Sequence, residues 1–173
     1  MEGTPESQPE DHLQSLYRFA LRLTGDRDAA YDLTQETFLR AWRSRRALRE
    51  PRAAKVWIFR IARNLWRDQL RKRRKLARTE GLPGEDREPA RDPSQLERLK
   101  NEEEVRAVIE AMESLPPRQR QVLHLSAFEG LGYREIGEVL SIGEAAVRSS
   151  LWLARKALRE RLHRILPRDG KGD

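Results

Sequence analysis

A chain of 173 residues is long enough for one medium domain or two small ones. Its 35 lysines and arginines outnumber its 28 acidic residues and give a formal charge of +7, which predicts an acidic partner. The chain contains no cysteine, which excludes disulfides and thiolate metal sites and favours a reducing cytoplasm, and no apolar run reaches the roughly 20 residues that cross a membrane.

The beginning of the chain predicts two helices. Leu, Ala, Arg and Glu dominate and alternating apolar patterns are absent, which favours an all-α protein. Residues 1–11 are acidic and polar and lack the apolar core of a signal peptide, so we expect a disordered lead-in. A helix over residues 12–24 ends at Gly25, and Asp26 caps a second helix over residues 27–45.

The second helix has two different faces. The residues expected to face inward are Ala30, Leu33, Phe38, Ala41 and Trp42. A partly exposed face carries Asp32, Gln35, Glu36 and Leu39. Acids and an amide beside an exposed leucine suit docking on a basic protein surface, although the ordinary solubility of a helix explains this pattern better when it is taken alone. Pro51 then disfavours helix at the residue before it, which predicts a loop over residues 46–54.

The most informative stretch is KVWIFRIARNLWRDQLRKRRK, residues 55–75. At about 100° per residue it separates an apolar side from an arginine side, with aromatic residues at the border. The three sets are Ile58, Ile61, Ala62, Leu65 and Gln69; Arg60, Arg63, Arg67, Arg71 and Arg74; and Trp57, Phe59 and Trp66. A nucleic-acid backbone can follow the arginines and an unstacked base can rest on the aromatics. The alternative is a core helix with a solvated basic face, but nine basic residues against one acid favour an anionic partner.

The next segment predicts a linker and the start of a second domain. Residues 76–93 are rich in glycine, proline and acids and keep no apolar period, which is typical of a flexible linker. Ser94 and Glu97 form a capping box that begins a helix over residues 95–113. Pro117 is well placed to begin the helix that follows, over residues 118–128.

Residues 133–162, YREIGEVLSIGEAAVRSSLWLARKALRERL, predict a helix-turn-helix. The expected turn is 141–143, and Gly137 is the small residue where the two helices approach closely. An exposed ridge on the second helix carries Arg148, Trp152, Arg155 and Arg159, and such a helix can enter a major groove. Many helical bundles mimic this pattern, so it is only moderately specific.

No arrangement of residues predicts catalysis. The chain has no phosphate-cradling Gly-Lys motif, no paired buried carboxylates and no nucleophile with a base partner. His12, His124 and His163 have no partner at metal-ligand spacing, so His124 is expected to be structural or solvated. We therefore expect no enzyme, no cofactor and no metal site.

Two motifs carry a resemblance to a known family. GDRDAAYDLTQETFLRAW followed by WIFRIARNLWRDQLRKRRK resembles domain two of bacterial sigma factors, and LPPRQRQVLHLSAFEGLGYREIGEVL resembles sigma domain four. The closest type is the short extracytoplasmic-function (ECF) group. The resemblance implies an all-α protein of two small helical domains joined by a flexible linker. The expected parts are the lead-in 1–11, domain two over 12–75, the linker 76–93, domain four over 94–166 and a polar tail 167–173.

The resemblance also implies three sets of site residues. Docking on core RNA polymerase is assigned to Asp32, Gln35, Glu36 and Leu39. Capture of the unwound strand at the minus-ten element is assigned to Leu48, Arg49, Arg60, Arg63, Asn64, Arg67 and Arg71. Contact with the minus-thirty-five duplex is assigned to Arg118, Arg134, Arg148, Ser149, Trp152 and Arg155. The arginines would hold phosphates, and Asn64 would either read a base edge or bond a neighbouring loop.

Three residues depart from the family pattern. The family has a threonine where Ala146 stands and basic residues where Ser150 and Leu153 stand, so weaker phosphate contact is expected. The sequence thus predicts a cytoplasmic alternative sigma factor that binds the β′ clamp and β flap of core RNA polymerase, promoter DNA and an anti-sigma factor, without membrane insertion. The alternatives are an autonomous helix-turn-helix regulator that binds duplex DNA as a dimer, and a protein-interaction module whose basic faces hold acidic partners.

Overall fold

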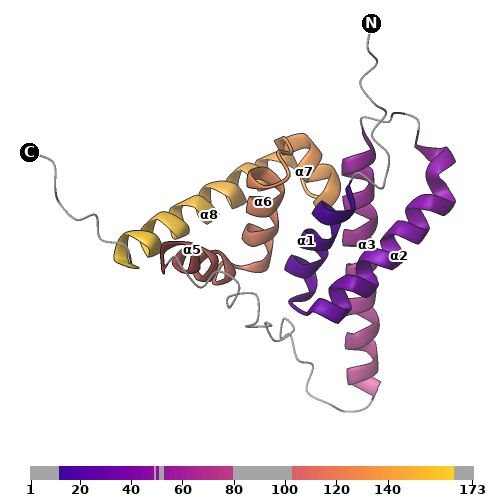
Figure 1. Ribbon diagram of the computed structural model, residues 1–173, viewed down its shortest axis with the longest axis horizontal. Helices are drawn as coiled ribbons and strands as arrows, with labels where there is room; N and C mark the ends of the chain where they lie inside the picture. The colour runs from indigo at the N-terminus through magenta and orange to yellow at the C-terminus, as the bar shows by residue number, and fades with distance from the viewer. Residues whose placement is uncertain (1–11, 49, 51–52, 80–102, 166–173) are drawn as a thin grey trace, which may run out of the picture. The chain divides into compact units, whose positions relative to one another are not determined.

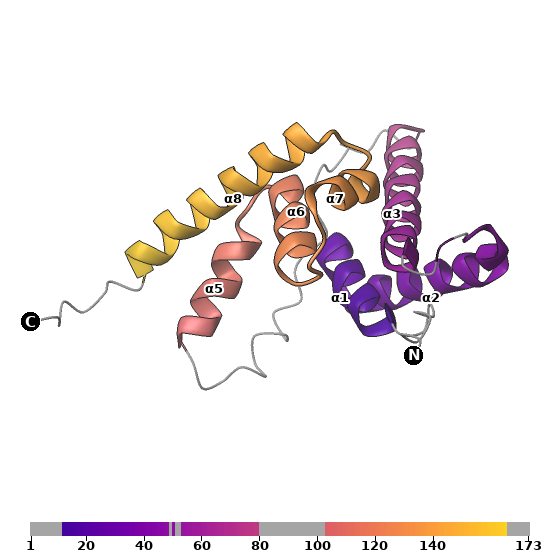
Figure 2. The same cartoon turned by 90° about the horizontal axis from the view of Figure 1, so that it is seen from above.

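The computed structural model describes residues 12–48, 50, 53–79 and 103–165, and all regular structure in these ranges is helical (Figures 1 and 2). The helices divide into two compact units. The first contains α1 (Leu13–Thr24), α2 (Arg27–Ser44), the 3-10 helix η2 (Arg45–Ala47) and α3 (Ala54–Thr79). The second contains α5 (Glu103–Glu113), α6 (Pro117–Ala127), most of α7 (Tyr133–Leu140) and α8 (Glu144–Ile165). The all-α, two-unit prediction is therefore confirmed.

Several sequence predictions fall outside the described residues. These are the lead-in 1–11, Arg49, Pro51, residues 80–102 with Ser94 and Glu97, and the tail 167–173. Where the chain is described, the boundary of the expected linker differs: α3 continues to Thr79, so the first four residues of that linker are helical. Leucine, alanine and arginine are good helix formers, which explains why the helix extends past Lys75. Apart from the start of α5, which borders residues outside the described ranges, the other helix ends lie within three residues of their predicted positions, and η2 occupies part of the expected loop.

The turn between α1 and α2 forms as its residues predict. Gly25 adopts a left-handed φ of 69°, which a side chain disfavours, and its N–H donates to the carbonyl of Leu21 at 2.8 Å. Asp26 then accepts a hydrogen bond from the N–H of Ala29 at 2.8 Å and caps α2. The two caps fix where α1 ends and α2 begins.

The first unit has a core in which α1, α2 and α3 contact one another pairwise. Phe19 on α1 and Phe59 on α3 are fully buried, with ring centroids 5.0 Å apart, and Trp66 is 4% exposed. Phe59 and Trp66 were expected at the border of α3 as stacking surfaces, and that prediction is wrong. Because α1 and α2 both pack on α3, the buried arc of α3 is wide enough to include them.

The buried stripe of α2 is more polar than hydropathy suggests. Thr34 and Thr37 are buried, and their hydroxyls donate to the carbonyls of Ala30 and Leu33 at 2.7 and 2.6 Å. Trp42 was expected to face inward but is 48% exposed, which corrects the prediction. Figures 1 and 2 both show the last turns of α2 diverging from α3, which agrees with an exposed side chain near the end of α2.

In the second unit, α5 and α6 each contact α8. A Cβ on Gly137 would lie 2.7 Å from the carbonyl oxygen of Ile142, so the predicted close approach is confirmed. His124 is buried, with its Nε2 3.5 Å from Oε1 of Glu129 and its ring stacked on Phe128 at 5.3 Å. His124 is therefore structural rather than solvated.

Candidate functional site

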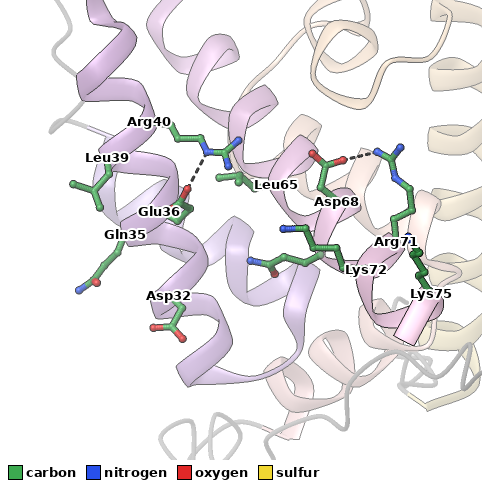
Figure 3. Close-up of a pocket in the computed structure, with 11 residues that line it drawn as sticks. Asp32, Gln35, Glu36, Leu39, Arg40, Leu65, Asp68, Arg71, Lys72 and Lys75 are labelled. Atoms are coloured by element: carbon green, nitrogen blue, oxygen red, sulfur yellow. Dashed lines mark hydrogen bonds and ion pairs between the residues drawn. The ribbon is translucent and has the colours of Figure 1, made fainter. Parts of the chain in front are cut away.

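An open groove of about 740 Å³ lies between α2 and α3 (Figure 3). Its α2 wall includes all four residues that the sequence assigned to protein docking: Asp32, Gln35, Glu36 and Leu39. Its α3 wall consists of Leu65, Asp68, Gln69, Arg71, Lys72 and Lys75. Leu39 is 50% exposed, whereas Leu33, the other leucine of α2, is fully buried. Leu39 therefore gives the groove an exposed apolar side chain between charged groups.

The two walls of the groove carry opposite charges. Oε1 of Glu36 accepts from Nε of Arg40 at 2.9 Å, while Asp32 is exposed one turn earlier (Figure 3). Across the groove, Lys72 and Lys75 are exposed on α3. Sequence reasoning counted these lysines only as part of the charge of α3. Lys72 and Lys75 follow Leu65 at helical spacing, and this spacing could have placed them on the groove side of α3.

Arg71 was assigned to the nucleic-acid face, but the structure places it on the rim of the groove. Its Nη2 lies 2.5 Å from Oδ1 of Asp68, and both side chains line the groove (Figure 3). Both partners are largely exposed, so the pair contributes little stability. The pair places the Arg71 guanidinium beside Asp68 on the rim of the groove.

The remaining basic face of α3 carries Arg60, Arg63, Asn64 and Arg67 at helical spacing. Arg60 and Arg67 are exposed, whereas Arg63 and Asn64 are half-buried. Burial lowers the pKa of Arg63 from its ordinary value, and the neighbouring cation of Arg67 lowers it further. Nε of Arg63 is buried without a hydrogen-bond partner. A phosphate at this face would offset the repulsion between the two guanidiniums, because it supplies an opposite charge.

Leu48 lies between η2 and α3 and is half-buried, so only part of its side chain is available to a ligand. Arg49, the next residue assigned to strand capture, lies outside the described residues. The structure therefore places Leu48 near the start of the connection to α3 and leaves Arg49 as a sequence-based prediction.

The second unit presents an exposed ridge along α8. The four α8 residues predicted to face DNA are all exposed: Arg148, Ser149, Trp152 and Arg155. The guanidinium of Arg148 lies 5.4 Å from the ring of Tyr133 and 3.4 Å from Glu144, while Nζ of Lys156 lies 5.3 Å from the ring of Trp152. Arg118 on α6 and Arg134 on α7 are also exposed.

The three residues that depart from the family pattern differ in how far they are exposed. Leu153 is 44% exposed, so a basic residue there would reach solvent or DNA. Ser150 is only 8% exposed and its side chain belongs to the packed side of α8. The expected loss of phosphate contact stays a prediction for both positions, and the burial of Ser150 argues against it at that position. Ala146 is half-exposed in the first turn of α8.

The described residues contain neither a metal-binding cluster nor a membrane-spanning helix. No group of three or more His, Cys, Asp or Glu side chains among them could hold a metal ion. None of the described helices combines the length and the apolar character that crossing a membrane requires.

Comparison with protein families gives two matches along the chain. Residues 10–76 match sigma-70 region 2, and residues 105–158 match sigma-70 region 4. The first range contains the groove and the basic face of α3, and the second contains the ridge of α8.

Characterised relatives cover most of the chain. It is 40% identical over 153 residues to the ECF RNA polymerase sigma factor SigE of Mycolicibacterium smegmatis, a match that covers 87% of this chain and 58% of SigE. It is 33% identical over 163 residues to the ECF RNA polymerase sigma factor SigL of Mycobacterium tuberculosis, covering 90% of this chain and 87% of SigL. The chain thus spans less than two thirds of SigE but most of SigL.

Solved structures show the same fold. The sigma factor RpoE from Bartonella quintana, determined in complex with the anti-sigma factor NepR, matches with a TM-score of 0.69 and 28% identity. That match covers 87% of this chain and 91% of the RpoE chain.

Proposed function

The chain belongs to the ECF RNA polymerase sigma factors, and we propose that it is an alternative sigma factor that binds core RNA polymerase, recognises promoter DNA and promotes strand opening. The observation that carries this proposal is the combination, in one helical unit, of a groove suited to protein docking and a separate cationic face on α3. In this role the protein acts by binding energy rather than by bond chemistry, and it works in the cytoplasm beside the polymerase.

Core RNA polymerase docks, in this proposal, on the groove between α2 and α3. Asp32, Gln35 and Glu36 offer acceptors to basic groups of the β′ clamp, and Leu39 supplies an apolar contact. The opposite wall adds cations that would meet acidic groups of the same partner. A partner with both signs of charge fits this groove better than a uniformly basic one.

Strand opening is assigned to the basic face of α3. Arg60, Arg63 and Arg67 would hold phosphates of the non-template strand, and Asn64 would read one displaced base. Unstacking a base costs a few kcal/mol, which phosphate and stacking contacts offset. The lowered pKa of Arg63 supports this assignment, because a bound anion would stabilise its charged form beside the cation of Arg67.

Recognition of the minus-thirty-five duplex is assigned to the second unit. The exposed ridge of Arg148, Ser149, Trp152 and Arg155 would enter the major groove, with Arg118 and Arg134 near phosphates or the β flap. Regulation by an anti-sigma factor is also proposed, because the relative RpoE was solved in complex with one.

The autonomous dimeric regulator is not favoured. A regulator of that kind needs only a helix-turn-helix, which would leave the match to sigma-70 region 2 and the charged groove without a role. It would also bind a two-fold symmetric duplex site without polymerase.

The docking proposal is tested with two charge reversals on α2. Asp32→Arg introduces a cation into the groove and is expected to weaken binding to core polymerase about tenfold or more, with a matching loss of promoter-specific transcription. Asp28→Arg, an exposed reversal on the same helix outside the groove, should retain binding. Circular dichroism checks that both variants keep their helix content. Equal affinity of Asp32→Arg and wild type for core polymerase would refute the docking surface.

A further inference from the structure

Arg148 on α8 contacts Tyr133 and Glu144, which belong to none of the assigned sites. The guanidinium carbon of Arg148 lies 5.4 Å from the centroid of the Tyr133 ring, which comes from α7. Nη2 of Arg148 lies 3.4 Å from Oε2 of Glu144, the first residue of α8. Because these contacts come from two different helices, the side chain of Arg148 is restricted from two directions before DNA arrives.

The ring of Tyr133 is the stronger of these restraints. Glu144 and Arg148 are four residues apart on one helix and both are largely exposed, and ion pairs of this kind hold their side chains weakly. A cation over an aromatic face is attracted by the ring and also loses part of its contact with water. The contact with Tyr133 therefore does most to fix where the Arg148 guanidinium lies.

The backbone that carries Tyr133 is itself fixed. Gly132, the residue before it, donates its N–H to Oε2 of Glu135 at 2.7 Å, and the carbonyl of Gly132 accepts from the N–H of Ile136 at 2.9 Å. These bonds hold the first turn of α7 in the manner of a capping box. Ile136 on α7 and Val147 on α8 are fully buried, so both helices that carry the Tyr133–Arg148 contact are anchored in the core.

We propose that Tyr133 is a positioning residue, which holds the guanidinium of Arg148 for contact with one guanine of the minus-thirty-five duplex. This inference rests on the proposed function and gives a role to a residue that the proposed function does not use. Arg148 lies in the second turn of α8, and the first turns of such a helix meet base edges in the major groove. Guanine presents the acceptors O6 and N7 side by side there, and one guanidinium can bond both.

Positioning raises affinity because it removes an entropic cost. A long side chain that becomes ordered only on binding weakens the complex by roughly 2- to 12-fold. The ring of Tyr133 orders Arg148 in advance, so this loss does not arise when DNA binds. The alternative role of Tyr133 is a direct bond from its hydroxyl to a phosphate. That role would not require the guanidinium to lie over the ring, which is the feature that the structure shows.

The test measures binding of promoter duplex to the full chain in complex with core RNA polymerase. In a series of duplexes, each guanine of the minus-thirty-five block is replaced in turn by 7-deazaguanine, which lacks the N7 acceptor. Wild type should bind one of these duplexes roughly tenfold more weakly than the unmodified duplex, and Arg148→Ala should show no such loss. Tyr133→Leu should bind the unmodified duplex roughly 2- to 12-fold more weakly than wild type, and its loss at the modified guanine should be smaller.

Two further variants show whether Tyr133 acts through Arg148 and through its ring. In a protein that already carries Arg148→Ala, Tyr133→Leu should cause no additional loss of affinity. Tyr133→Phe keeps the ring without the hydroxyl and should behave as wild type. Tyr31→Leu is the matched control, because Tyr31 is a 58% exposed ring on α2 outside every assigned site, and this variant should bind all duplexes as wild type does.

Several results would overturn the inference. A loss from Tyr133→Leu that persists in the Arg148→Ala protein would identify a phosphate contact or a general effect on the fold. An equal loss from Tyr133→Phe would identify the hydroxyl as the active group. Unchanged affinity of Tyr133→Leu, or a wild type whose guanine sensitivity does not depend on Arg148, would also overturn it. In each of these cases wild type still binds polymerase and promoter duplex, whereas failure of the proposed function means that it binds neither.

Discussion

Gly137 gives the sharpest prediction about the helix-turn-helix. A Cβ added at Gly137 would lie 2.7 Å from the backbone oxygen of Ile142. The two residues are also joined by a hydrogen bond, in which the N–H of Ile142 donates to the carbonyl of Gly137 at 3.0 Å. A backbone oxygen cannot rotate away as a flexible side chain can, so the turn between α7 and α8 must shift. Forced shifts of this kind cost about 3 kcal/mol at the upper end of the overpacking range.

The helix propensity of alanine opposes this cost but is smaller. Alanine gains about 1 kcal/mol over glycine in a helix interior, so Gly137→Ala should lower the free energy of unfolding by about 2 kcal/mol. The measurement is urea unfolding of the full chain followed by circular dichroism. Gly143→Ala is the control, because a Cβ there meets nothing within 4 Å and costs below about 1 kcal/mol through weaker capping. A Gly137→Ala protein as stable as wild type would refute the close-approach argument.

The remaining predictions concern DNA. Leu153→Lys should strengthen binding to promoter duplex and steepen its salt dependence by about 1 in the log–log slope, whereas Ser150→Lys should destabilise the fold, because its position is 8% exposed. Salt titrations of DNA binding and thermal unfolding distinguish the two variants. The same effect of lysine at both positions would contradict the argument that Leu153 is exposed and Ser150 is buried. Asn64→Ala should reduce discrimination at one minus-ten base by roughly 5- to 150-fold, measured with single-base promoter variants. Unchanged promoter choice and opening would show that Asn64 reads no base.

Local signals predicted the helices well. The sequence pattern from Tyr133 to Leu140, then the turn, then a helix from Glu144 agrees with α7 and α8. The Gly25 stop and the Asp26 cap also formed as expected. These features depend on residues within a few positions of one another, so their physics is contained in a short stretch of chain.

Features that depend on how helices pack were harder to predict. Helical periodicity placed Phe59 at a border, but a partner ring, Phe19, comes from a different helix and buries it. Trp42 looked like a core residue by type, yet its side chain is 48% exposed near the end of α2, where that helix diverges from α3. Thr34 and Thr37 take the buried positions because their hydroxyls bond the helix backbone, which hydropathy alone does not register.

The candidate site shows the same division. The resemblance to sigma domain two assigned Asp32, Gln35, Glu36 and Leu39 to docking, and these four residues lie within two turns of one helix that lines the groove. The α3 wall could not be assigned in this way, because it is defined by which side of α3 faces α2. Arg71 was therefore grouped with the nucleic-acid face, and Lys72 and Lys75 were left without a role, until the groove joined them.

The most direct test of this account is run-off transcription from a randomised promoter library with purified core RNA polymerase, with and without the full chain. The account predicts transcripts only when the chain is present, from templates that share two sequence blocks at a fixed separation, one for each helical unit. Transcripts that do not depend on the chain, or selection of a single two-fold symmetric site that the chain binds without polymerase, would contradict it.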